Sequence, residues 1–228
     1  MSVICIIPAR GGSKRVPRKN IRDFCGRPII AYSIGAALES GLFDEVMVST
    51  DDAEIASVSR SLGAEVPFMR GGRASGDLAT TADVLEEVLG AYLSAGRRFD
   101  ALCCLYATAP FVTSAKLREG LGMLRGADSV VSATAFSFPP QRGFLTDGEG
   151  AASWWMPEFA SARSQDLPTV YHDAGQFYFA RTEAFLGERS LVCGRCRLLP
   201  LPEKEVQDID SESDWEMAEM KYKRMVTG

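Results

Sequence analysis

The stretch Val3–Asn20, V-I-C-I-I-P-A-R-G-G-S-K-R-V-P-R-K-N, indicates the fold of this 228-residue chain. Its first five residues are apolar and are followed by Pro8, as is typical of a buried strand. A loop that follows such a strand lies at the carboxyl edge of an open α/β sheet, where ligands bind. This loop carries several cationic side chains, namely Arg10, Lys14, Arg15, Arg18 and Lys19. We therefore expect it to bind a polyphosphate.

Two glycines, Gly11 and Gly12, support this interpretation. Glycines let the backbone turn its N–H groups toward an anion at close range. The patterns G-x-x-x-x-G-K-[ST] and G-x-G-x-x-G are both absent, so neither a P-loop nor a dinucleotide fold is indicated. A basic loop is often only a solvated surface, but the preceding strand, the glycines and Ser13 favour a binding loop here.

Composition excludes several classes of protein. The net charge of −5 argues against general nucleic-acid binding. No apolar run approaches the roughly 18 residues of a membrane span, and Val3–Ile7 is too short for a signal peptide. We expect a cytoplasmic protein with reduced cysteines and no membrane partner. The C-x-x-C motif at Cys193–Cys196 has no second pair of ligands, so a zinc site is not indicated.

The rest of the chain up to Ala135 alternates short apolar runs with helical patterns. This alternation predicts an α/β fold with a mostly parallel sheet and helices on both faces. Helix signals include Pro28, Gly41, the candidate caps Thr50, Asp51 and Asp52, and Thr80. Strands are expected over Glu45–Thr50, Asp100–Tyr106 and Asp128–Ala135, and later over Gly175–Ala180, with extended pieces at Glu65–Arg70, Leu198–Leu201 and Glu205–Ile209.

The alternation stops near Phe136. Arg142–Leu145 and Ala151–Trp155 flank an Asp-Gly turn and predict a hairpin. Its aromatic residues either form an interface or cap the core, and we favour a dimer contact. The chain is therefore expected to be one domain, 1–228, with 136–170 as an insertion that dimerises and closes over the substrate.

Two carboxylates, Asp208 and Asp210, form a second candidate site. In an extended segment, residues two apart point to the same side, so the pair could hold Mg²⁺ together with phosphate oxygens. The alternative is that Asp210 only caps the following helix. A third candidate is the segment Arg70–Thr81, which leads into a helix N-terminus suited to anions. The single histidine, His172, favours a structural or substrate-contacting role over that of a catalytic base.

These motifs resemble the CMP-sugar acid synthetases, the cytidylyltransferases that activate nonulosonic acids. The loop P-A-R-G-G-S-K-R-V-P-R-K-N matches their signature, and D-F-C-G-R-P, Y-A-T-A-P-F, Y-H-D-A-G-Q-F-Y and V-Q-D-I-D-S-E-S-D-W extend the likeness over most of the chain, closest to the pseudaminic acid branch. The resemblance implies a three-layer, Rossmann-like nucleotidyltransferase fold with a mixed, mostly parallel sheet and a small dimerisation hairpin. Ala107 stands where relatives often carry proline.

The resemblance also implies roles for particular residues. Arg10, Lys19 and Asp210 would be catalytic, and Asp208 and Asp210 would bind Mg²⁺. Residues that would bind the nucleotide are Ala9, Arg10, Gly11, Gly12, Ser13, Lys14, Lys19, Asn20, Arg70, Asp77, Thr80 and Thr81. Residues that would contact the sugar acid are Tyr106, Thr108, Arg163, Gln165, His172, Gln176, Phe177 and Tyr178, of which Arg163 and Gln165 match a segment that reaches into the partner subunit's site in relatives.

The implied reaction joins CTP to a nine-carbon 2-keto sugar acid and releases pyrophosphate. A homodimer would make the CMP-sugar acid, most simply CMP-pseudaminic acid, for surface glycan or flagellin glycosylation. N-acetylneuraminic acid, legionaminic acid and the eight-carbon Kdo are alternative substrates. A non-catalytic nucleotide-binding regulatory protein is an alternative of another class, although such a protein has no evident need of the Asp208 and Asp210 pair.

Overall fold

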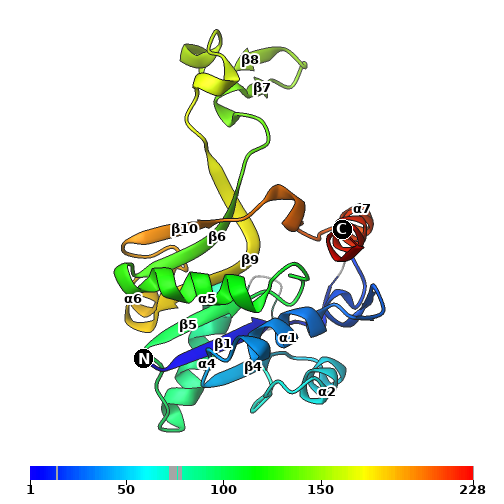
Figure 1. The fold of residues 1–228 in the computed structure, drawn as a ribbon, viewed down its shortest axis with the longest axis vertical. Coiled ribbons are helices and arrows are strands. Elements are labelled where there is room, and N and C mark those ends of the chain that lie inside the picture. Colours follow the sequence, from blue (N-terminus) through cyan, green and yellow to red (C-terminus); the bar gives the residue numbers. More distant parts are fainter. Residues whose placement is uncertain (14, 72–75, 77–78, 228) are drawn as a thin grey trace.

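A mixed six-stranded sheet forms the centre of the computed structural model, which describes residues 1–13, 15–71, 76 and 79–227 of the 228. Figure 1 shows the sheet, whose order is β10-β6-β9-β5-β1-β4. Only β9 runs antiparallel to its neighbours, β5 and β6. The strands are β1 (Val3–Pro8), β4 (Glu45–Ser49), β5 (Ala101–Leu105), β6 (Ser129–Ala135), β9 (Tyr171–Arg181) and β10 (Cys196–Pro200). The predicted α/β fold with a mostly parallel sheet is confirmed.

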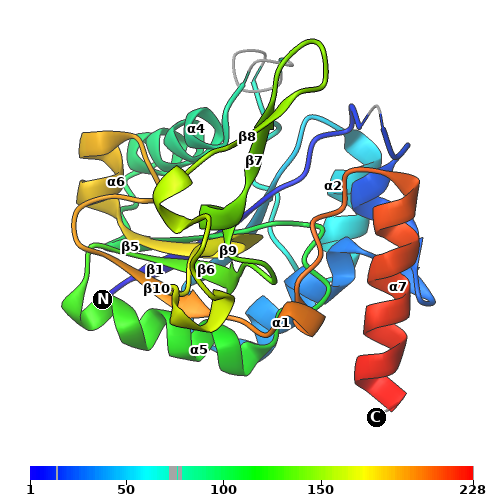
Figure 2. The same cartoon turned by 90° about the horizontal axis from the view of Figure 1, so that it is seen from above.

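Helices cover both faces of this sheet (Figure 2). Val3, Cys5 and Ile7 of β1 belong to the apolar cluster on one face, and the alternate residues Ile4 and Ile6 belong to the cluster on the other. The first cluster includes α1 (Ile30–Ser40), α2 (Ala53–Ser61) and α5 (Ser114–Met123), and the second includes α4 (Thr81–Ser94) and α6 (Thr182–Glu188). Because β1 is buried on both sides, its sequence is apolar throughout rather than alternating.

The predicted caps define several helix ends. Asp52 accepts hydrogen bonds from the backbone N–H groups of Glu54 and Ile55 at the start of α2, and Thr80 forms a capping box at the start of α4. Gly41 ends α1 in the left-handed conformation, with φ of 64°. Pro28 was expected in the first turn of α1 but lies in a short ribbon made of β2 (Asp23–Phe24) and β3 (Arg27–Pro28).

The C-terminal helix α7 (Glu212–Thr227) packs beside the loop that follows β1. Their contact is a third apolar cluster that includes Val16 from the loop, Ile209 before the helix, and Trp215 on it. Phe24 of β2 makes an edge-to-face contact with Trp215, at a ring distance of 5.5 Å. This cluster brings the loop after β1 and the segment before α7 together, so that the cationic loop lies next to Asp210.

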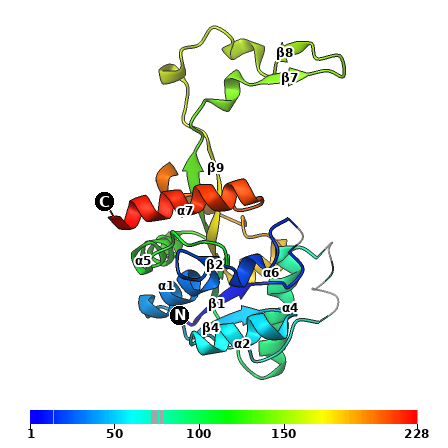
Figure 3. The same cartoon turned by 90° about the vertical axis from the view of Figure 1, so that its right-hand side faces the viewer.

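The segment 136–170 projects from the body of the molecule as an arm, as the views in Figures 1 and 3 both show. Its hairpin consists of β7 (Phe144–Thr146) and β8 (Ala152–Trp154), which form a sheet of their own. The predicted hairpin is therefore present, with strands slightly shorter than expected. Phe144, Leu145 and Trp155 are each more than half exposed on it.

Some elements were not predicted. Helix α6 was missed, and β9 begins at Tyr171 rather than Gly175, because its first residues pair with β6 beyond a register shift at Val131–Ala133. The piece predicted over Glu205–Ile209 is not a strand: it begins in a 3₁₀ turn, Glu203–Glu205, and continues as irregular backbone. No helix among the described residues is long and apolar enough to cross a membrane.

Candidate active site

A cavity of about 630 Å³ opens at the carboxyl ends of β1 and β5. The loop after β1, the start of α4, the loop after β5 and the segment before α7 all contribute to it. It thus lies where open α/β sheets bind ligands. The predicted site residues that line it are Arg10, Ser13, Lys19, Asn20, Arg70, Thr80, Thr81, Tyr106, Thr108, Asp208 and Asp210. Lys14 and Asp77 lie outside the described residues.

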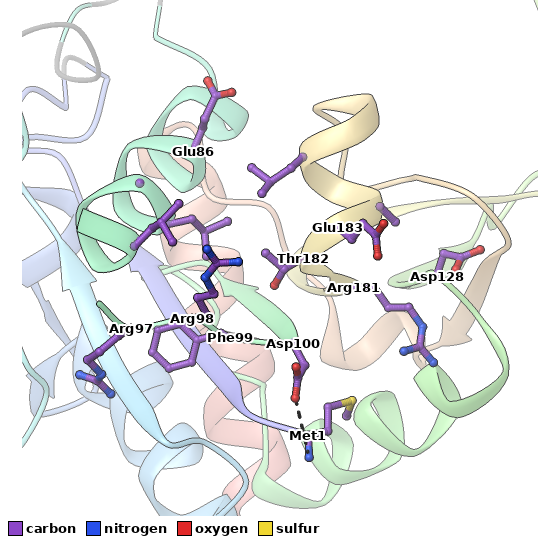
Figure 4. A pocket seen from close by; sticks show the side chains of 15 residues that line it. Met1, Glu86, Arg97, Arg98, Phe99, Asp100, Asp128, Arg181, Thr182 and Glu183 are labelled. Atoms are coloured by element: carbon purple, nitrogen blue, oxygen red, sulfur yellow. Dashed lines mark ion pairs between the residues drawn. The ribbon is translucent and has the colours of Figure 1, made fainter. Parts of the chain in front are cut away.

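A second cavity, of about 1060 Å³, lies at the opposite edge of the sheet (Figure 4). Leu89 and Leu93 of α4 and Leu186 of α6 line it together with Met1 and Phe99. None of the predicted site residues in the described part of the chain lines this cavity. Charged side chains such as Arg97, Asp100 and Arg181 also line it, but predicted site residues gather in the smaller cavity.

The cationic loop divides into structural and cavity-lining residues. Arg18 has a left-handed backbone, with φ of 55°, and its guanidinium forms ion pairs with Asp52 and Glu54. Its hydrogen bond to Asp52 is the largest cause of the lowered pKa of that carboxyl, and backbone N–H groups of α2 contribute further. Arg18 therefore anchors the loop to α2. Arg15, which was not assigned a role from sequence, lines the cavity and lies 3.0 Å from an Asp210 oxygen.

Lys19 lies between the loop and the carboxylate segment. Its ammonium group donates a hydrogen bond to the Ile209 carbonyl and lies 3.7 Å from Asp210 Oδ1. Asn20 donates to the Arg10 carbonyl at 2.9 Å, so it shapes the loop as well as lining the cavity. The Lys19 contacts hold the loop beside Asp210.

The backbone N–H groups of Gly11 and Ala9 are engaged within the protein. The Gly11 N–H donates to Asp51 Oδ1 at 2.8 Å, so it is not directed at a ligand. Neither Gly11 nor Gly12 has a positive φ. A Cβ on Gly11 would lie 2.7 Å from Asp52 Oδ2, which makes close packing the reason for this glycine. Ala9 is fully buried, and its N–H donates to the Ser49 carbonyl at 2.9 Å.

Arg70 and the start of α4 form the opposite wall. The Arg70 guanidinium is buried and donates to the Ser49 carbonyl at 2.6 Å and to Ser49 Oγ at 3.1 Å. Burial lowers the pKa of Arg70, although nearby carboxylates oppose this effect. Thr80 caps α4, and Thr81 Oγ1 lies 3.4 Å from the Tyr106 hydroxyl. The N-terminus of α4 therefore faces the cavity, with a dipole that favours anions.

Asp208 and Asp210 line the same cavity, while Ile209 between them is buried in the apolar cluster under α7. Burial is the largest cause of the raised pKa of Asp208, and the charge of Asp210 adds to it. Asp214, rather than Asp210, accepts the N–H groups of Asp210 and Ser211 at the start of α7. The described residues contain no cluster of three or more metal-ligating side chains, so this pair would need ligand oxygens to hold a cation.

The residues expected to contact the sugar acid are spread over three environments. Tyr106 and Thr108 line the cavity. Tyr178 packs edge-to-face on Tyr106 at 5.7 Å, and its hydroxyl donates to Asp173. Burial raises the pKa of both tyrosines. Phe177 is fully buried in the apolar core beside α5, so it packs the core and does not line the cavity.

Gln176 is almost fully buried, and its side-chain amide donates to the Glu205 carbonyl at 2.5 Å. Its Oε1 has no hydrogen-bond partner in the described part of the protein. Arg163, Gln165 and His172 are exposed on or beside the arm and do not line the cavity of their own chain. Arg163 pairs with Asp166 at 2.7 Å. His172 instead lies against the Phe136 ring, at 4.7 Å between centroids.

Comparison with known proteins identifies related sequences. The family model described as cytidylyltransferase matches residues 4–146. The pseudaminic acid cytidylyltransferase of Campylobacter jejuni is 42% identical over 225 residues, covering 98% of this chain and 97% of the relative. The CMP-N,N'-diacetyllegionaminic acid synthase of Legionella pneumophila is 34% identical, covering 96% and 95%.

The fold itself also has solved counterparts. A CMP:2-keto-3-deoxy-manno-octonic acid synthetase complexed with CTP superimposes with a TM-score of 0.70 at 18% identity, covering 99% of this chain and all of the other. The 4-diphosphocytidyl-2C-methyl-D-erythritol synthase of Anaerococcus prevotii gives the same TM-score at 14% identity, covering 98% and 99%. The family model covers the loop after β1 and the strands β1, β4, β5 and β6 of the sheet. The chain belongs to the cytidylyltransferase family.

Proposed function

We propose that this protein transfers the CMP group of CTP to a nonulosonic acid, with pseudaminic acid as the acid, and releases pyrophosphate. The observation that carries the proposal is that Arg10 and Lys19 line one cavity together with Asp208 and Asp210. Relatives that span nearly the whole chain are named as pseudaminic acid cytidylyltransferases.

In the proposed reaction, a hydroxyl oxygen of the sugar acid attacks the α-phosphorus of CTP. The bond between the α-phosphorus and the bridging oxygen breaks, pyrophosphate leaves with the bond electrons, and the hydroxyl proton passes to solvent. Lys19 and Arg10 would stabilise the negative charge that develops on the transferred phosphate and on pyrophosphate. The positive end of the α4 dipole would favour the same charge. Positioning and charge stabilisation suffice, so no covalent nucleophile is required.

We assign Asp208 and Asp210 as the residues that would hold Mg²⁺. The two carboxylates line one cavity, and burial together with the charge of Asp210 raises the pKa of Asp208. A hard cation bound between them would offset the repulsion between the two carboxylates. A bound Mg²⁺ would neutralise phosphate charge in the ground and transition states. Arg15 and Lys19 lie beside Asp210 here, so both side chains would be near the nucleotide phosphates as well.

We further propose that the enzyme is a cytoplasmic homodimer and that the arm forms the contact. Exposed aromatic and aliphatic side chains on β7 and in the residues that follow β8 support this assignment. Arg163 and Gln165 would reach the partner subunit's site, because they do not line the cavity of their own chain. The product would serve surface glycan or flagellin glycosylation.

The test is a CTP-dependent assay of pyrophosphate release with a panel of sugar acids. Pseudaminic acid is expected to give the highest kcat/KM, with N-acetylneuraminic acid, legionaminic acid and Kdo well below it. A higher kcat/KM with one of the other acids would reassign the substrate but retain the reaction. Binding of CTP without turnover of any acid would contradict the enzymatic function and favour a regulatory protein.

A further inference from the structure

The segment 203–210, which carries Asp208 and Asp210, has no partner strand and no regular structure after its 3₁₀ turn. Side chains from other elements donate to several of its backbone carbonyls. The Gln176 amide of β9 donates to the Glu205 carbonyl at 2.5 Å, and Lys221 of α7 donates to the Val206 carbonyl at 2.7 Å. Lys221 also reaches the Glu203 carbonyl at 3.4 Å. Irregular backbone held by such donors takes its position from them.

An ion pair holds the same turn from a third direction. Lys116 of α5 lies 2.6 Å from Glu205 Oε2, and both side chains are mostly buried, at 15% and 19% exposed. Lys116 also donates to the Phe111 carbonyl at 3.1 Å, in the loop that follows β5. A partly buried pair of this kind is sensitive to the loss of either member, because the remaining charge is left without a partner.

These contacts connect the turn to the walls of the active-site cavity. The Gln176 carbonyl accepts the Tyr106 N–H at 2.9 Å, so one residue links the end of β5 to the turn. Lys116 links the turn to the loop that contains Thr108 and Phe111. Two residues after Val206, the chain reaches Asp208.

We propose that Gln176, Lys116 and Lys221 form a clamp on the turn Glu203–Val206 that positions Asp208 and Asp210 for the metal. This inference rests on the proposed function. It gives Gln176, which was expected to contact the sugar acid, a positioning role instead. The clamp residues contact the turn before Asp208 rather than the carboxylates themselves. They matter because a small misplacement of the carboxylates weakens metal binding and catalysis together.

The experiment measures Mn²⁺, as a paramagnetic substitute for Mg²⁺, by electron paramagnetic resonance. The full-length protein is held in complex with a CTP analogue whose α,β-bridging oxygen is replaced by methylene. Variants are Lys221→Met, Gln176→Leu and Lys116→Met. Binding of the analogue without metal is measured in parallel, together with pyrophosphate release. Lys223→Met is the matched control, because Lys223 lies on the same helix and, in the described part of the protein, its ammonium group pairs with Glu219 at 2.8 Å and not with the turn.

Each clamp variant is expected to lower Mn²⁺ affinity and kcat by about 10- to 100-fold. Metal-free binding of the analogue should stay within a factor of about two to three, and Lys223→Met should match the wild type. Lys116→Arg keeps the charge and should recover most of the affinity. Since Lys221 is half-buried whereas Gln176 is almost fully buried, Lys221→Met tests the clamp even if the other two variants fail to fold.

Two outcomes would overturn the clamp. Unchanged Mn²⁺ affinity in folded Lys221→Met would show that the turn does not position the carboxylates. An equal loss of metal-free analogue binding would show a general disturbance of the cavity. Failure of the metal assignment is recognised separately. In that case Asp208→Asn and Asp210→Asn would bind Mn²⁺ with the same affinity as the wild type. Failure of the proposed function appears as absence of pyrophosphate release in the wild type.

Discussion

At the scale of single residues, Gly11 and Gly12 are neighbours with different requirements. A methyl group on Gly11 would meet the Asp52 carboxylate at 2.7 Å, whereas a methyl group on Gly12 would meet nothing within 4 Å. Asp52 is the N-cap of α2 and the partner of Arg18. Close packing therefore requires a glycine at position 11, whereas the space around position 12 would accept a larger side chain.

Gly11→Ala is expected to destabilise the protein by about 1–2 kcal/mol, because Asp52 must move and its cap hydrogen bonds weaken. Gly12→Ala should change the unfolding free energy by less than about 0.5 kcal/mol. Urea unfolding of both variants and the wild type measures the difference. Equal effects from the two substitutions would contradict the steric explanation.

Lys19 is a cavity-lining cation to which we assign stabilisation of the transferred phosphate. It lines the cavity, and its ammonium group lies between the Ile209 carbonyl and Asp210. Lys19→Ala is expected to lower kcat for pyrophosphate release by about 10²- to 10³-fold, as for removal of one charge-stabilising donor. Lys223→Ala, on the surface of α7, serves as the control. A kcat unchanged from the wild type would exclude Lys19 from transition-state stabilisation.

At the scale of elements, the start of α2 is coupled to pH through Asp52. The pKa of Asp52 is lowered in the folded state by Arg18 and by the N–H groups of α2. Its ordinary value in an unfolded chain is about 4. The unfolded chain therefore binds a proton at a higher pH than the folded protein does. The stability that Asp52 contributes is complete above that ordinary value and is lost as the pH falls through the lower folded-state pKa.

Wild-type protein should accordingly lose more unfolding free energy between pH 5 and about pH 3 than Asp52→Asn does. The measurement is a urea unfolding series at several pH values for each protein. Asp166→Asn, which alters a half-exposed carboxylate on the arm, is the control and should follow the wild-type slope. If the slopes of wild type and Asp52→Asn coincide, the pairing of Asp52 with Arg18 contributes no pH-dependent stability.

Elements whose signals are local could be predicted from the sequence. The caps Asp52 and Thr80 accept hydrogen bonds from residues two or three positions away, so their roles are visible in the sequence itself. The start of β9 is different, because it pairs with β6 across about 40 residues and a register shift. The local sequence pattern does not indicate pairing with a strand so distant in the chain, and the predicted strand is therefore too short.

The same distinction applies to the candidate site. The cationic loop and the Asp208–Asp210 pair are compact motifs, and the structure places them in one cavity. Arg18 anchors the loop through an ion pair with Asp52, which is 34 residues away. The Gln176 amide donates a hydrogen bond to the Glu205 carbonyl, 29 residues away. Their roles depend on which side chains the fold brings together, and the sequence motif alone does not contain this information.

At the scale of the whole molecule, two exposed apolar regions are candidates for the interface of the proposed dimer. One is the arm, where Phe144, Leu145 and Trp155 are 59%, 56% and 52% exposed. The other is the large cavity of Figure 4, where Leu93 and Leu186 are 50% and 44% exposed. The arm extends away from the sheet, so its exposed side chains can reach another molecule without disturbing the core (Figures 1 and 3).

Phe144→Asp combined with Leu145→Asp is therefore expected to convert a dimer into a monomer at micromolar concentration. Charges placed in an apolar contact lose more hydration than they gain in pairing. Analytical ultracentrifugation measures the mass, and far-UV circular dichroism with thermal unfolding checks that the sheet is intact. Leu93→Asp with Leu186→Asp is the matched control and should remain dimeric. A dimer that survives the arm substitutions but dissociates with the control pair would move the interface to the cavity between α4 and α6.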